Sequence, residues 1–150
     1  MAEREYRTKE VLVRWDSELC IHTAKCIRRA PDAFDSTRRP WIQLEGTEPE
    51  DIADAVRLCP TGALTFARLD GVAEGAEEDV VIELRPNGPY YVRGPVKVVT
   101  PAGEVVHDGP RVALCRCGNT KNAPFCDNTH REIGFRDPPL RPATGPEAPA

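Results

Sequence analysis

Short apolar runs in the first half of the chain follow two spacings, which predict strands and helices in turn. Val11 and Val13 alternate with polar neighbours, as in a strand with one buried face. Apolar residues recur with a helical period before Pro60, and Thr47 and Glu50 have the spacing of a capping box. The predicted elements of this α+β unit are a strand over 9–15, a helix over 24–29, an extended piece over 41–44, a helix over 51–59 and a strand over 63–68.

The second half contains only short β-prone runs from Val80 onward. Asn87-Gly88 and Gly94-Pro95 are turn signals, and so are the segments 101–103 and 108–110. The predicted strands cover 80–84, 90–92, 96–99, 104–106 and 112–114. We therefore expect a small antiparallel sheet in this half.

Two segments without an apolar period divide the chain. Residues 70–79 are rich in Gly, Ala and Glu and are predicted to be a linker. Residues 137–150 are rich in Pro and Ala and are predicted to be a disordered tail. The fold class is thus predicted as α+β, with a small α+β domain over 1–69 followed by a small β-rich domain over 80–136.

Charge and hydropathy argue against two classes of partner. The net charge of -4 on 150 residues leaves no broad cationic surface for nucleic acid. No apolar run is long enough to span a bilayer, and the charged segment 1–9 lacks a secretory apolar stretch. We expect a cytoplasmic protein that binds neither nucleic acid nor membrane. Because each half alone buries a modest core, additional staples are expected to hold the fold.

The six cysteines divide evenly between the two halves. Cytosolic reductants keep thiols reduced, so metal ligation or redox chemistry is a better prediction for them than disulfides. Two of the three histidines fall within these groups, whereas His107 has no cysteine neighbour and is predicted to be a strand or turn residue. The first group is Cys20, Cys26 and Cys59 with His22, and the second is Cys115, Cys117 and Cys126 with His130.

The spacing of the second group suits a metal centre. Cys115 and Cys117 project to the same side of an extended chain. Cys126 and His130 share a face if a helical turn begins near Asp127. Three thiolates and an imidazole can hold tetrahedral zinc as well as iron, so the spacing alone leaves the metal open.

The sequence CRCGNTKNAPFCDNTH over 115–130 resembles the CDGSH iron-sulfur domain family, the mitoNEET-like proteins, whose motif is C-x-C-x2-[ST]-x3-P-x-C-D-G-[SAT]-H. Every defined position matches except one, because Asn128 stands where the family has glycine. Asparagine is the side chain that best tolerates a left-handed backbone after glycine. The resemblance implies a homodimer, and it favours iron-sulfur over zinc. The [2Fe-2S] ligands that it implies are Cys115, Cys117, Cys126 and His130.

One histidine among the ligands has a physical consequence. Neutral imidazole in place of a thiolate makes the cluster less negative and raises its potential. His130 must stay unprotonated on the ligating nitrogen, so acid competes with iron. We predict that the visible absorption of this cluster is lost faster as the pH falls below neutrality, and that His130→Cys removes the effect.

The first group has the spacing of a divergent ferredoxin site. Bacterial ferredoxins combine closely spaced cysteines with a remote Cys-Pro, and here Cys20 and Cys26 are followed by Cys59-Pro60. Three cysteines suit a [3Fe-4S] cluster, or a [4Fe-4S] cluster with another ligand on the fourth iron. His22 is the nearest candidate for that ligand, and the alternative is that it is a solvated loop residue.

Several segments between 6 and 68 resemble the divergent single-cluster ferredoxin family that binds [4Fe-4S]. They are CIHTAKC over 20–26, PDAF over 31–34, RPW over 39–41 and CPTGAL over 59–64. The resemblance implies a ferredoxin-like N-terminal domain with one cluster, and it leaves the number of irons open.

Together these features predict a two-cluster iron-sulfur protein that acts as an electron carrier or relay between redox partner proteins. No nucleophile with a paired base, phosphate loop or Rossmann fingerprint appears, so we expect no catalytic site of its own. Cluster storage, cluster transfer or redox and pH sensing is the first alternative. A zinc-stapled interaction module is the second.

Overall fold

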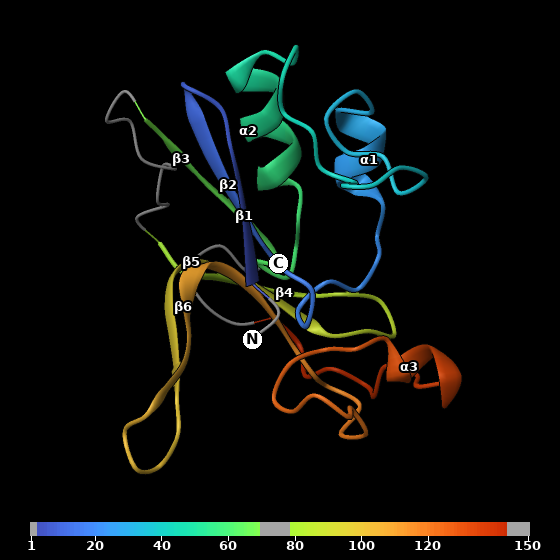
Figure 1. Ribbon diagram of the computed structural model, residues 1–150. Helices are drawn as coiled ribbons and strands as arrows, with labels where there is room; N and C mark the ends of the chain where they lie inside the picture. The colour runs from blue at the N-terminus through green and yellow to red at the C-terminus, as the bar shows by residue number, and fades with distance from the viewer. Residues whose placement is uncertain (1–2, 70–78, 144–150) are drawn as a thin grey trace.

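Each half of the chain forms its own small sheet. The computed structural model describes residues 3–69 and 79–143. Figure 1 shows the first half, coloured blue to green, beside the second half, coloured yellow to red. The two sheets are each three-stranded, in the orders β1-β2-β3 and β4-β5-β6. The mixed α and β content predicted from the sequence is confirmed, whereas a ferredoxin-like arrangement of the first half stays a prediction.

The first sheet is antiparallel and is covered on one side by two helices (Figure 1). Its helices and two of its strands lie where the sequence predicts them, within two residues at most ends. β1 was not predicted, because its residues are almost all polar and exposed. The elements are β1 (Glu3–Arg7), β2 (Val11–Asp16), α1 (Lys25–Arg29), α2 (Pro49–Arg57) and β3 (Leu64–Arg68).

The start of α2 differs from the prediction. The helix is capped by Glu48, which makes no side-chain cap hydrogen bond, so the capping box predicted for Thr47 and Glu50 is wrong. Pro49 occupies the first turn, where its missing N–H costs nothing and its fixed φ suits a helix. Proline therefore sets this boundary in place of the predicted side-chain cap.

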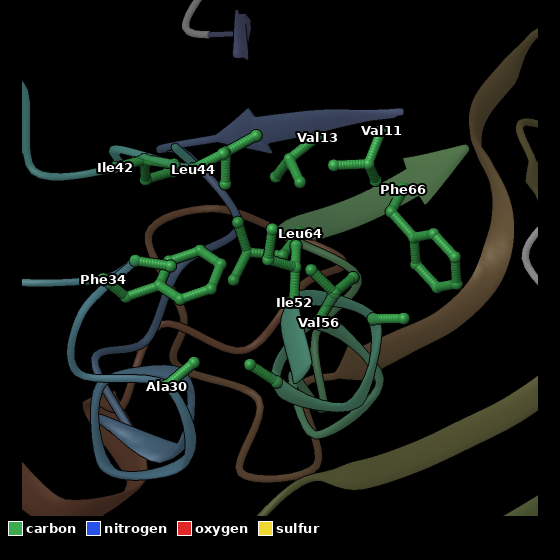
Figure 2. Packing of buried hydrophobic residues seen from close by; sticks show 13 residues of the cluster. Val11, Val13, Ala30, Phe34, Ile42, Leu44, Ile52, Val56, Leu64 and Phe66 are labelled. Atoms are coloured by element: carbon green, nitrogen blue, oxygen red, sulfur yellow. The ribbon is translucent and has the colours of Figure 1, made fainter. Parts of the chain in front are cut away.

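The core of the first half lies between this sheet and α2, as Figure 2 shows. Ile52 and Val56 of α2 face Leu64 of β3, and Phe34 lies beside them in the same cluster. Phe34, Ile52 and Val56 are fully buried, and each such side chain contributes roughly 1.5–3 kcal/mol. The extended piece predicted over 41–44 makes only an isolated bridge, between Ile42 and Phe34.

The second sheet is built from longer strands than the sequence predicts. Four of the predicted runs merge into the two strands β5 and β6, because the turn signals inside them do not end the strands. Gly94, with φ of 116°, lies at a shift in register between Arg93 and Val96, and Asp108 stays paired with Lys97. The strands are β4 (Val81–Leu84), β5 (Tyr90–Val99) and β6 (Val105–Leu114).

The remaining predicted segments are short. The helical turn expected near Asp127 is α3 (Thr129–Glu132), and the turn at Asn87 joins β4 to β5. Residues 70–78 of the predicted linker and 144–150 of the predicted tail lie outside the described residues. In the described part of the chain, every helix is too short or too polar to cross a membrane.

Candidate metal centres

The loop after β6 folds back on its own strand and so brings the second cysteine group together. The N–H of Cys115 donates to Pro124 at 2.8 Å, and the N–H of Cys126 donates to Ala113 at 2.9 Å. These two bonds close the loop between Cys115 and Cys126. Their backbones therefore lie side by side, although ten residues separate them in sequence.

The four predicted ligands form two close pairs. The Sγ atoms of Cys115 and Cys117 lie 3.7 Å apart. The Sγ of Cys126 lies 3.7 Å from Nδ1 of His130. Two sulfur ligands about 2.3 Å from one tetrahedral metal lie roughly 3.8 Å apart, so each pair has the spacing of two ligands on one metal atom. Nδ1 is thus the nitrogen of His130 that faces the sulfur.

Burial raises the pKa of the Cys115 and Cys126 thiols, and hydrogen bonds from backbone N–H groups lower it to different extents. Desolvation raises the pKa of Cys115, but the N–H groups of Thr120 and Gly118 outweigh it and leave this pKa below its usual value. The Gly118 N–H lies 3.3 Å from the Cys115 sulfur. Burial raises the pKa of Cys126, which is 4% exposed, and the N–H of Asn128 counters this only in part. Cys115 is therefore the more readily ionised of these two thiols.

Two polar residues of the motif act as loop supports. Asp127 accepts the N–H of Lys121 at 2.9 Å and the N–H of Thr129 at 3.0 Å, so it joins the loop to the start of α3. The side-chain hydrogen bond from Thr129 is the largest cause that lowers the pKa of Asp127 to about 2. The Thr120 hydroxyl donates to the Phe125 carbonyl at 2.7 Å. These bonds hold the ligand loop in place without any metal contact.

Arg116, between the two cysteines of the first pair, connects the loop to the turn after β4. Its guanidinium donates to the carbonyls of Gly88 at 2.7 Å and Arg85 at 2.8 Å, and it pairs with Asp137. The side chain is 7% exposed. This role could not be predicted from the sequence, because nothing local distinguishes Arg116 from a surface arginine. Asp137, at the start of the predicted tail, is held by this ion pair.

This arrangement fits a two-metal cluster better than a single ion. In residues 3–69 and 79–143, no three His, Cys, Asp or Glu side chains converge on one ion position. A mononuclear zinc site needs at least three protein ligands around one metal. Two separate ligand pairs instead match a cluster whose irons are each held by two side chains.

The first cysteine group lies around the ends of the two helices of the other half. Cys26 is in the first turn of α1, Cys59 follows the end of α2, and Cys20 lies in the loop after β2. Cys26 and Cys59 pack against the hydrophobic core. Exposed His22, with φ of 57°, places Nδ1 3.8 Å from the Cys20 sulfur. Its role as a fourth ligand stays a prediction.

In this group, the negative charge of one ionised cysteine makes the ionisation of its neighbours less favourable. Burial is the largest cause that raises the pKa of Cys26 to about 11, and the charges of Cys59 and Cys20 contribute to the rise. Burial is also the largest cause of the raised pKa of Cys20, with a contribution from Cys59. Like charges this close ionise together only when a cation or cluster binds them. Neutral thiols, or thiolates bound to a cation or cluster, are therefore the favoured states of this group.

A buried indole provides a further test of fit. The Nε1 of Trp15 is buried. A side-chain hydrogen bond from Trp15 lowers the pKa of the Cys20 thiol. A buried N–H beside a ligand sulfur can donate to that sulfur or to a further acceptor bound there. Cluster sulfide would be such an acceptor, so the residues present fit an iron-sulfur group.

The comparisons with known proteins agree with this division into two sites. Residues 6–69 match the family described as divergent 4Fe-4S mono-cluster, and residues 87–131 match the family described as iron-binding zinc finger CDGSH type. The chain joins a mono-cluster domain to a CDGSH domain. It is an iron-sulfur protein, with a [4Fe-4S] cluster indicated for the first domain and a cluster of the [2Fe-2S] type for the second.

The similar curated proteins match less than half of this chain. The uncharacterized protein YjdI of Escherichia coli strain K12 is 27% identical over 63 residues, which is 42% of this chain and 83% of that protein. The protein of the same name from Escherichia coli O157:H7 matches equally well. The match therefore spans most of the relative and less than half of this chain.

The two domains touch at their ligand loops. Asn128 donates from Nδ2 to the carbonyl of Ile21 at 2.7 Å, and Asn122 donates to the carbonyl of Glu18 at 2.8 Å. The Ile21 side chain also packs against Cys126. The loop that carries Cys20 in the mono-cluster domain thus lies directly on the ligand loop of the CDGSH domain. No motif in the sequence signals this contact, because it joins residues more than 100 positions apart.

A cationic cavity of about 480 Å³ opens beside His130. A Cβ built on Gly88 would lie 3.6 Å from Nε2 of His130, so this nitrogen points to the cavity side of the ring. Three arginine residues line the cavity, and no Asp or Glu of the described residues does. The arginines, which the sequence analysis did not single out, are Arg85, Arg131 and Arg136.

Proposed function

We propose that this protein is a two-cluster electron relay that passes single electrons between redox partner proteins and has no catalytic site of its own. One observation carries the proposal. Two iron-sulfur domains occur in one chain, and the loops that bear their proposed ligands are in contact through Ile21 and Cys126. Bound clusters would supply one-electron redox chemistry, and the protein would hold them close together and away from water.

The proposed ligands of the two clusters are the cysteines and histidines predicted from the sequence. In the CDGSH domain Cys115, Cys117, Cys126 and His130 would hold a [2Fe-2S] cluster. In the mono-cluster domain Cys20, Cys26 and Cys59 would hold the other cluster. The family match favours [4Fe-4S] over [3Fe-4S] there, with His22 as the proposed fourth ligand.

The direct test is redox titration of anaerobically purified protein, followed by low-temperature electron paramagnetic resonance. We expect two distinct signals that appear and disappear reversibly, with iron and acid-labile sulfide content unchanged after each cycle. Irreversible loss of iron on the first cycle would contradict the relay. It would favour cluster storage, transfer or sensing, which intact transfer of the cluster to an apo-acceptor would then establish.

The cationic cavity supports a partner with an acidic surface. The protein as a whole is acidic, with a net charge of -4, so this local excess of positive charge stands out from its surroundings. Charge of one sign in a concave site raises association rates with oppositely charged partners. A donor or acceptor seated there would lie against His130, a proposed cluster ligand.

Reversing the charge at the cavity should change the rates of electron transfer to anionic and to cationic acceptors in opposite directions. We expect Arg131→Glu with Arg136→Glu to slow oxidation of the reduced protein by ferricyanide roughly tenfold at low salt, and to leave oxidation by hexaamminecobalt(III) equal or faster. Stopped-flow absorbance measures both rates. Arg4→Glu with Arg7→Glu on exposed β1 changes the net charge equally. An equal loss in that control would show that net charge, and no local docking site, governs the rate.

Pairing of two chains through the CDGSH domain is the second partner proposal. Edge strand β4 exposes apolar side chains, and Ile82 is 60% exposed. Exposed apolar side chains on an edge strand, even a four-residue one, offer a surface for pairing with another chain. We expect sedimentation at twice the chain mass of 16.6 kDa, and at the single-chain mass for Ile82→Lys. A wild-type protein that sediments as one chain would refute the dimer.

A further inference from the structure

Asn128 occupies the position at which the CDGSH motif has glycine, and it contacts both ligand loops. Its backbone is left-handed, with φ of 71°. Its main-chain N–H donates to the Cys126 sulfur at 3.5 Å. Its side-chain Nδ2 donates to the Ile21 carbonyl at 2.7 Å. Glycine could adopt the same backbone and make the first bond, but only a side chain can make the second.

The far end of this connection is the first ligand loop. Ile21 lies between Cys20 and His22, and its carbonyl carbon is bonded directly to the nitrogen of His22. The Ile21 side chain is 8% exposed and packs with Cys126 and Ala113, with Tyr91 at the margin. The peptide groups next to Cys20 are therefore fixed against the CDGSH domain by packing as well as by the hydrogen bond.

Asparagine at this position carries a cost that glycine would avoid. The Oδ1 atom of Asn128 is buried and has no hydrogen-bond partner among the described residues. A buried polar atom without a partner is destabilising, and glycine is the residue best suited to a left-handed backbone. Stability of the loop alone would thus favour glycine. The side chain is better explained by its reach to Ile21.

We propose that Asn128 is the positioning residue that couples the two clusters of the relay. The connection runs from the Cys126 sulfur to the Asn128 N–H, along the Asn128 side chain, and across its hydrogen bond to the peptide group between Ile21 and His22, next to Cys20 in the chain. One electron passes, so one iron-sulfur cluster is oxidised by one electron, the other is reduced by one, and no atom moves between them. This inference rests on the relay function proposed above.

The test compares intramolecular electron transfer in three variants of the full two-cluster protein. Pulsed reduction followed by optical spectroscopy gives the rate at which the clusters equilibrate. We expect Asn128→Gly to lower this rate by roughly tenfold or more, within the range typical when a residue behind a metal ligand is removed. Asn128→Asp keeps the size and the backbone preference but lacks the amide donor, so it should also be slow.

Asn122→Ala is the matched control, because it removes the other side-chain bond between the domains, the one to Glu18. It should leave the rate unchanged. For Asn128→Gly, two further measurements do not depend on the electron-transfer rate. The potentials of both clusters should stay the same in Asn128→Gly, since the N–H to Cys126 remains. Hydrogen exchange should show loss of protection in the Cys20 loop without loss of either fold.

The outcomes separate this inference from the relay function itself. If the wild-type clusters do not exchange electrons, the relay fails first. If they exchange at equal rates in the wild type, Asn128→Gly and Asn128→Asp, only the role of Asn128 is overturned. Equal slowing in Asn122→Ala would also overturn it, because general contact between the domains would then be sufficient. If Asn128→Gly does not keep both clusters, Asn128→Asp decides by the same comparison.

Discussion

Replacing Cys115 by alanine is expected to remove the cluster of the CDGSH domain and to leave that of the mono-cluster domain in place. Cys115 contributes a thiol whose pKa, despite burial, lies below its ordinary value because N–H groups of Thr120 and Gly118 face its sulfur. Without it, Cys117 has no partner at the spacing of two ligands on one metal. Three remaining ligands do not complete two tetrahedral iron atoms.

The reciprocal variant makes this a test of two sites. Cys59→Ala should remove the mono-cluster signal and keep the other, because Cys59 lies outside the CDGSH ligand loop. Iron and sulfide analysis with electron paramagnetic resonance measures both losses. His107→Gln is the control, since Nε2–H of His107 donates to the Arg111 carbonyl at 2.9 Å and His107 belongs to neither ligand set. Loss of both clusters in each cysteine variant would contradict two independent centres.

The fold was predictable where local pattern and packing agree. Val11 and Val13 alternate, and the strand β2 that contains them is fully buried at both. The limits lie where pairing overrides local signals. Gly94-Pro95 breaks the apolar run, yet β5 continues because a shift in register absorbs the break. β1 has no apolar pattern, and it is a strand because it pairs along its length with β2.

The candidate sites also contain a part that the sequence predicts and a part that only the folded chain reveals. Ligand spacing is a local property, so the sequence alone predicted the pairs that the structure brings within 3.7 Å. Asn128 was noticed only for its backbone, and its left-handed φ confirms that expectation. Its side-chain bond to Ile21 depends on how two distant loops pack. The cavity arginines likewise come together only in the folded chain.

Acid should remove the CDGSH cluster in a manner that depends on His130. Desolvation is the largest cause that lowers the pKa of His130 below its ordinary 6.5, and the cations Arg131 and Arg116 add to it. The folded chain thus binds this proton less readily than the unfolded chain does. The stability that the neutral His130 imidazole contributes to the folded chain is therefore present above pH 6.5. It is lost as the pH falls through the lowered pKa of His130.

Because only neutral imidazole can ligate iron, the rate of absorption loss should rise as the pH falls below 6.5, approaching about tenfold per pH unit. His130→Cys should give a rate that is nearly constant over the same range and a lower potential, since a thiolate adds negative charge. His22→Gln controls for the other ligand-loop histidine and should behave as the wild type does. Visible absorbance against time at a series of pH values measures the rates. An acid-dependent loss that persists in His130→Cys would show that another group is protonated, and that Nδ1 of His130 is not the labile ligand.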